Sequence, residues 1–202
     1  MGSPLANPTL VLGLGQFGRE VCGLLSRQAS DRAPPNLVVL RAGLARAETP
    51  PGAAPQEERR GTPAGPISPG GAEEGSLAAG DESGLSGLVE RVRGEARRLL
   101  DLKHRVETTG AGDARPPRLD LFLIADLTEP GAAPLAPLLV ERLGLRLREE
   151  FRPIFQGTGG RLTVSPVLAV PRAGGGRAEV KAAIDALDAL ARGEERRRPL
   201  AS

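Results

Sequence analysis

The sequence predicts an α/β protein with a small parallel sheet of about four strands, helices on both faces of that sheet, and a long disordered insertion. Three observations carry this prediction. Short apolar runs alternate with amphipathic segments along the chain, as is typical of parallel strands joined by right-handed helical crossovers. The first apolar run leads through a glycine-spaced turn into a helix, and a stretch with scarcely a large aliphatic residue interrupts the pattern.

The first three elements lie before residue 42. Residues 9–12 are uncharged and rich in aliphatic side chains, as expected of a strand that is buried on both faces. A helix is predicted over residues 17–27, and a second strand over residues 36–41. Cys22 falls among apolar residues of the helix, where a small buried side chain is expected.

The turn between the first strand and helix has the spacing Gly-x-Gly-x-x-Gly. Gly13 would form the tight turn, Gly15 would let a pyrophosphate approach the backbone, and Gly18 would let helix and strand pack closely. Free amides at the helix start, around Gln16 and Phe17, would then face an anion. The alternative is a glycine-rich turn that binds no ligand.

Composition divides the chain into four segments: residues 1–42 and 85–193 form the α/β domain, residues 43–84 form the insertion, and residues 194–202 form a charged tail. The insertion consists mainly of Pro, Gly, Ala, Glu and Ser. Such a segment cannot bury enough apolar surface to offset the entropy of ordering, so we expect disorder there. Its deletion should leave the fold intact.

The pattern resumes with a crossover helix over residues 85–106, for which Ser86 is a plausible N-cap. A strand over residues 119–126 is followed by a helix over residues 134–155. We expect Pro153 to kink or end that helix.

A last strand over residues 162–170 precedes a helix over residues 180–190. Pro166 removes a backbone donor from this strand, which should therefore lie at an edge of the sheet or at a bulge.

Ligands bind at the carboxyl ends of the strands in parallel sheets, and this rule selects the candidate site. Besides the glycine turn, that rim collects Arg41 at the end of the second strand, Asp126 at the end of the third, and Arg172 and Arg177 after the fourth. An arginine at position 41, where an acid would hold the ribose diol of NAD, suits a 2′-phosphate or means that no dinucleotide binds. Asp126 could accept from a ribose hydroxyl or hold a metal-bound water, or could simply cap a helix.

Composition limits the other functions. The 202 residues include 27 basic and 25 acidic ones, a net charge of +2, with four Phe and no Trp or Tyr. This balance and the scarcity of aromatic rings argue against a nucleic-acid partner.

One cysteine excludes a disulfide framework and a cysteine-rich metal site. Without a run of about 18 apolar residues or a cleavable leader, we expect a cytoplasmic protein with no membrane contact. No catalytic residues are predicted, because no nucleophile has a base nearby in sequence.

Residues 11–21, Val-Leu-Gly-Leu-Gly-Gln-Phe-Gly-Arg-Glu-Val, resemble the opening of Rossmann-type NAD(P)-binding domains, notably those that regulate potassium uptake. The resemblance implies regulation by a bound nucleotide without chemistry, although Arg41 replaces the acid usual in that family. The same run, together with the strand that begins at Leu119, resembles the front half of bacterial tubulin-like proteins. Residues 126–130 do not match the second glycine loop of that family, so GTP hydrolysis is not expected.

Two hypotheses follow. In the first, the domain binds a nucleotide for regulation, with NADP preferred to NAD. In the second, it is a ligand-free, degenerate Rossmann-like or tubulin-like scaffold that engages a protein partner or a second copy of itself.

Overall fold

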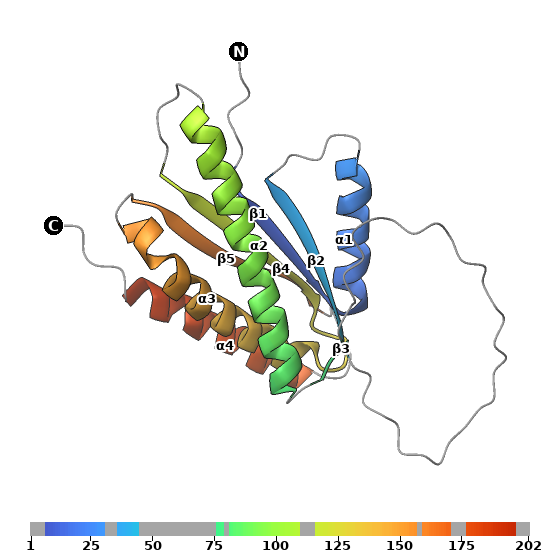
Figure 1. The fold of residues 1–202 in the computed structure, drawn as a ribbon. Coiled ribbons are helices and arrows are strands. Elements are labelled where there is room, and N and C mark those ends of the chain that lie inside the picture. Colours follow the sequence, from blue (N-terminus) through green and yellow to red (C-terminus); the bar gives the residue numbers. More distant parts are fainter. Residues whose placement is uncertain are drawn as a thin grey trace.

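The structure is a computed structural model, which describes residues 7–30, 36–44, 76–78, 81–109, 116–156, 159–170 and 177–196. In chain order its elements are β1 (Thr9–Leu14), α1 (Gly15–Ser30), β2 (Leu37–Leu44), β3 (Ser76–Leu77), α2 (Glu82–Thr109), β4 (Arg118–Asp126), α3 (Ala132–Gln156), β5 (Arg161–Ala169) and α4 (Arg177–Arg196). The strands form one parallel sheet in the order β3-β2-β1-β4-β5 (Figure 1). The predicted fold class is confirmed: four strands have six to nine residues each, and β3 adds two.

Side chains alternate between the two faces of β1, and each face has its own helices. Leu10, Leu12 and Leu14 are fully buried in the larger core, together with residues of α2 and α3. Val11 points to the opposite face, where it packs with Cys22 of α1 and Ile124 of β4. Period-two alternation explains this division, and the predicted burial of Cys22 is confirmed.

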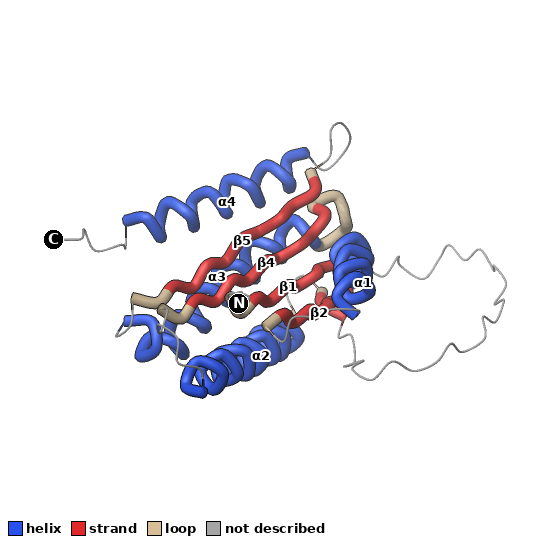
Figure 2. The backbone as a smooth tube through the Cα atoms, turned by 90° about the horizontal axis from the view of Figure 1, so that it is seen from above, coloured by secondary structure: helices blue, strands red, loops and turns tan. Residues whose placement is uncertain are grey.

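The far edge of the sheet is β5, as Pro166 predicted. The helix that follows, α4, packs mainly against α3 and buries Val180 and Ala183 there. Figure 2 shows α4 beyond β5, on the side of the sheet away from α1 and β2. Val167 of β5 consequently stays half exposed.

Parts of the predicted insertion belong to the sheet, and its last three residues belong to α2. Gly43 and Leu44 continue β2 and pair with Ser76 and Leu77, and Leu77 is buried in the larger core. Two residues are too few to show a strand periodicity, which is why the sequence did not reveal β3. The central part of the insertion, residues 45–75, lies outside the described residues.

Helix boundaries also differ from the prediction. Helix α2 begins at Glu82, and its cap is Asp81, whose Oδ1 accepts a hydrogen bond of 2.9 Å from the Gly84 amide. Ser86 lies inside the helix, so its predicted capping role is wrong. The position was misjudged because Gly84 and the polar residues before it obscured the first turn.

The last two helices are longer than predicted. Pro153 lies within α3, which continues to Gln156, because a proline in the last turn removes only one backbone hydrogen bond. Helix α4 extends three residues into the predicted tail of 194–202. The rest of that tail lies outside the described part of the chain.

Candidate functional site

The predicted site lies where β1 gives way to α1. Gly15 has a φ of 74°, in the left-handed region that glycine adopts at little cost. The predicted turn glycine was Gly13, so the turn conformation falls two residues later than expected. Gln16 and Phe17 follow as the second and third residues of α1. Their amides are among the four at a helix start that have no partner within the helix.

Both amides bind a carboxylate of the same chain. Glu129 Oε2 accepts from the Gln16 amide at 2.7 Å, and Glu129 Oε1 accepts from the Phe17 amide at 2.7 Å. These lengths are typical of charge-assisted hydrogen bonds, and a negative charge at this end of α1 also interacts favourably with the helix dipole. The place predicted for a ligand phosphate is therefore occupied by Glu129.

Gly15 is necessary for this arrangement. A Cβ built on Gly15 would collide with the carboxylate of Glu129, at Oε2 and Cδ. The space that Gly15 was predicted to leave for a pyrophosphate is therefore used by the side chain of Glu129.

The strand order brings Glu129 to α1, and Asp126 shapes the turn that presents it. Strand β4 pairs with β1, so the end of β4 lies beside the glycine turn. Asp126 Oδ1 accepts from the Thr128 amide at 2.8 Å and from the Thr128 hydroxyl at 2.7 Å, and the Asp126 carbonyl accepts from the Glu129 amide at 3.1 Å. These bonds form a compact Asx-type turn. Asp126 therefore caps its own turn and not a helix, since α3 begins only at Ala132.

The other two glycines of the motif are packing positions. A Cβ on Gly13 would collide with the carbonyl of Gly18 and approach Cys22 Sγ to 2.7 Å. A Cβ on Gly18 would lie 2.6 Å from the Ile124 carbonyl oxygen. The predicted packing role of Gly18 is confirmed, and Gly13 shares it: together they let α1 lie close to β1 and β4.

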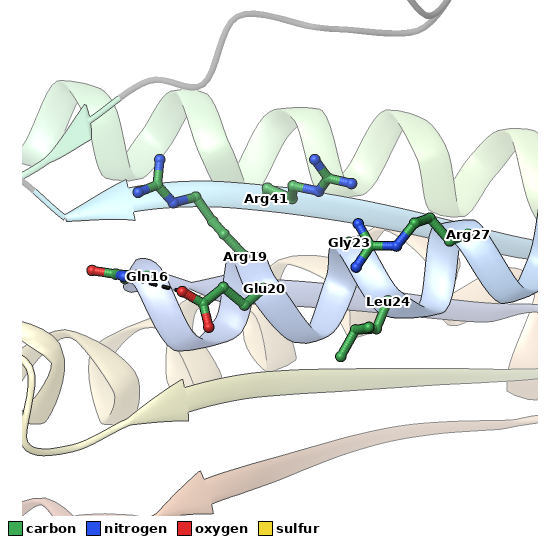
Figure 3. A pocket seen from close by; sticks show the side chains of 7 residues that line it. All are labelled: Gln16, Arg19, Glu20, Gly23, Leu24, Arg27 and Arg41. Carbon is green, nitrogen blue, oxygen red and sulfur yellow. Dashed lines mark hydrogen bonds between the residues drawn. The ribbon is translucent and has the colours of Figure 1, made fainter. Parts of the chain in front are cut away.

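Arg41 lies within β2, paired with Gly13, and not at the end of the strand as predicted. Its guanidinium enters a groove of about 790 Å³ alongside the body of α1 (Figure 3). The groove is lined by Gln16, Arg19, Glu20, Gly23, Leu24, Arg27 and Arg41. Burial raises the pKa of the neighbouring Cys22 thiol, and the positive charge of Arg41 partly opposes this increase.

Two further arginines were predicted for the site. Arg177 is the first residue of α4 and is exposed, and Arg172 lies outside the described residues. The structure thus brings Gly15, Gln16 and Phe17 together with the β4–α3 turn, while Arg41 belongs to the groove.

Glu129 is the site residue that sequence reasoning missed. It lies three residues after the end of β4, at the carboxyl end of the sheet. The signal that could have identified it is the topology: an acid that follows a strand adjacent to β1 can reach the unpaired amides of α1. Sequence reasoning assigned Asp126 of that loop three candidate roles and Glu129 none, because the contact with α1 depends on the position of the loop in space.

No described helix has both the length and the apolar character that crossing a membrane requires. No cluster of three or more His, Cys, Asp or Glu side chains suited to a metal ion occurs among the residues described. Comparisons with protein-family models, curated proteins and solved structures find no match to this chain.

Proposed function

We propose that this protein is a ligand-free Rossmann-like scaffold that acts through a protein partner, with Glu129 in the place that a nucleotide phosphate would take. The observation that supports this proposal is the pair of 2.7 Å hydrogen bonds from the Gln16 and Phe17 amides to one carboxylate. In this arrangement the two amides already have an anionic partner that is covalently part of the domain.

A competing ligand would have to displace that partner. A hydrogen bond to a charged group contributes about 1.5–3 kcal/mol when shielded from water. Glu129 is half-buried and the two amides are solvent-accessible, so we discount the pair to about 1–2 kcal/mol in total. Displacement would therefore weaken a phosphate ligand by roughly 5–30-fold, and the released carboxylate would add repulsion.

Regulation by an NADP-like nucleotide is the competing hypothesis, and it makes a different demand on the structure. It requires Glu129 to leave the amides and Arg41 to reach the ligand from the groove beside α1. The scaffold proposal requires neither movement, and for this reason we prefer it. It assigns the domain no catalysis and no cofactor.

The test measures thermal stability with NADPH, NADH, GTP and ATP for the wild type, Glu129→Ala and a matched control, Glu141→Ala. Glu141 is an exposed glutamate of α3 with no hydrogen bond or ion pair among the described residues. A ligand at a hundred times its dissociation constant would stabilise the protein by about 2.7 kcal/mol. We expect no increase for the wild type or the control with any of the four nucleotides.

An increase of several degrees in the wild type would contradict the scaffold proposal. It would favour nucleotide binding, particularly if Glu129→Ala enlarged the increase and Glu141→Ala left it unchanged.

A further inference from the structure

The groove beside α1 is strongly basic. Three of its lining residues are arginines, Arg19, Arg27 and Arg41, against one glutamate. That glutamate, Glu20, accepts a hydrogen bond of 3.0 Å from the side chain of Gln16. Figure 3 shows the three guanidinium groups on the side of α1 that faces β2. Like charges gathered in one groove favour an anionic occupant.

Gly23 leaves room for such an occupant between two of the arginines. A Cβ built on Gly23 would lie 3.7 Å from a terminal nitrogen of Arg27 and 3.9 Å from one of Arg41. A carboxylate near this point could therefore contact both guanidinium groups. Within the described ranges, neither Arg27 nor Arg41 forms an ion pair or a side-chain hydrogen bond.

The groove lies along α1 and reaches β2 at Arg41. Among the described residues, the outer edge of β2 is largely unpaired. In the described part of the chain, β3 pairs with β2 only at Gly43 and Leu44. The Asn36 carbonyl faces β1, because it accepts from the Thr9 amide at 2.8 Å. Backbone groups alternate along a strand, so those of Val39 and Arg41 point away from β1 toward the free edge.

From this juxtaposition we infer that the edge of β2 binds an extended acidic segment of a partner protein. The segment would pair its main chain with Val39 and Arg41 and place a carboxylate between Arg27 and Arg41. Addition of a strand to a free edge is a recurrent mode of peptide recognition, and β3 shows that this edge accepts one. The inference rests on the proposed function, since it names the surface and the partner chemistry of the scaffold.

A peptide fits these features better than a nucleic acid does. Unpaired strand amides and carbonyls are matched by another peptide backbone, which a phosphodiester chain lacks. None of the described residues that line the groove has an aromatic ring on which a base could stack. Leu24, which is 52% exposed, offers an apolar contact beside the charges, as alternating side chains of a bound strand would use.

The test is fluorescence anisotropy with a labelled peptide of about six residues that alternates glutamate and valine. The protein variants are Arg27→Glu/Arg41→Glu and a control with the same charge change, Arg118→Glu/Arg152→Glu, at two exposed positions outside the groove. A second peptide has the same sequence with N-methylated amides, which cannot pair with a strand. Inorganic phosphate and a short oligonucleotide serve as competitors.

We expect the wild type to bind the first peptide, the groove variant to bind it about tenfold more weakly, and the control to stay within about twofold. The N-methylated peptide should fail to bind. If the groove variant proves unfolded by circular dichroism, Arg27→Glu alone, at an exposed helix position, should still weaken binding by about threefold.

Several results would overturn the inference. These are no binding by the wild type, equal losses in the groove variant and the control, equal binding of the N-methylated peptide, or displacement by phosphate or oligonucleotide at the same concentrations. Stronger peptide binding by a Glu73→Lys/Glu74→Lys variant would also overturn it, because that result would assign the groove to the acidic residues of this chain's own insertion. A nucleotide-induced thermal shift would instead count against the scaffold proposal, so the two failures are distinguishable.

Discussion

Removal of the Glu129 carboxylate should destabilise the folded protein even though no ligand is involved. Glu129→Ala leaves the Gln16 and Phe17 amides without the acceptors that now lie 2.7 Å from each. Both amides can be rehydrated, so the loss resembles that of a helix cap together with a helix-dipole interaction, about 1–2 kcal/mol in all. For a domain of this size, that change lowers the melting temperature by about 3–6 °C. The stability of Glu129→Gln should fall between that of the wild type and that of Glu129→Ala, because the glutamine side-chain oxygen still accepts from one amide.

The assay is urea unfolding followed by circular dichroism for the wild type, Glu129→Ala, Glu129→Gln and the control Glu141→Ala. The control should stay within about 0.5 kcal/mol of the wild type, since Glu141 is exposed and forms no hydrogen bond or ion pair in the described structure. A Glu129→Ala variant as stable as the control would refute the reasoning, because the two hydrogen bonds would then contribute nothing.

Three further predictions concern the packing of α1, the buried thiol and the insertion. Gly13→Ala places a methyl group against the Gly18 carbonyl and Cys22 Sγ. It should lower the free energy of unfolding, measured in urea, by about 2–3 kcal/mol. Gly87→Ala, at a helix position with open space around it, should instead raise that free energy by about 0.5–1 kcal/mol. Because burial raises the pKa of Cys22 in the folded state, the unfolded chain loses its thiol proton first. The stability of the wild type relative to Cys22→Ala should therefore fall as the pH rises above about 8, and an unchanged difference would contradict this sign. Replacing residues 45–75 by a short glycine linker should leave unfolding cooperative. Deleting residues 43–84 should lower the free energy of unfolding by at least about 2 kcal/mol, because Leu77 is then removed from the core. Similar stability of the two deletion variants would show that β3 is dispensable.

The architecture could be predicted because its signals are periodic or sterically strict. Apolar runs gave the four longer strands, and Pro166 placed the last of them at an edge. Gly18 was identified as a packing position because close contact between a helix and its strand needs a missing side chain. The parallel topology then placed the loops at the correct ends of the sheet.

The site could be predicted only in part, because its decisive contact joins residues more than a hundred positions apart. The glycine spacing showed where unpaired amides would lie, but it gave no information on which acceptor binds them. Helix termini attract carboxylates of the same chain as well as phosphates, and only the position of Glu129 in space distinguishes these outcomes. Arg41 was misplaced because β2 continues for three residues beyond it, after the strongly apolar run has ended.

Hydrogen exchange at the Gln16 and Phe17 amides tests the central claim most directly. Amides at the start of a helix have no helical partner, so their protection depends on Glu129. We predict that both amides exchange about 5–30-fold more slowly in the wild type than in Glu129→Ala, with Glu141→Ala matching the wild type. Equally rapid exchange in all three proteins would mean that the carboxylate does not occupy these amides and that the anion site at the start of α1 is open.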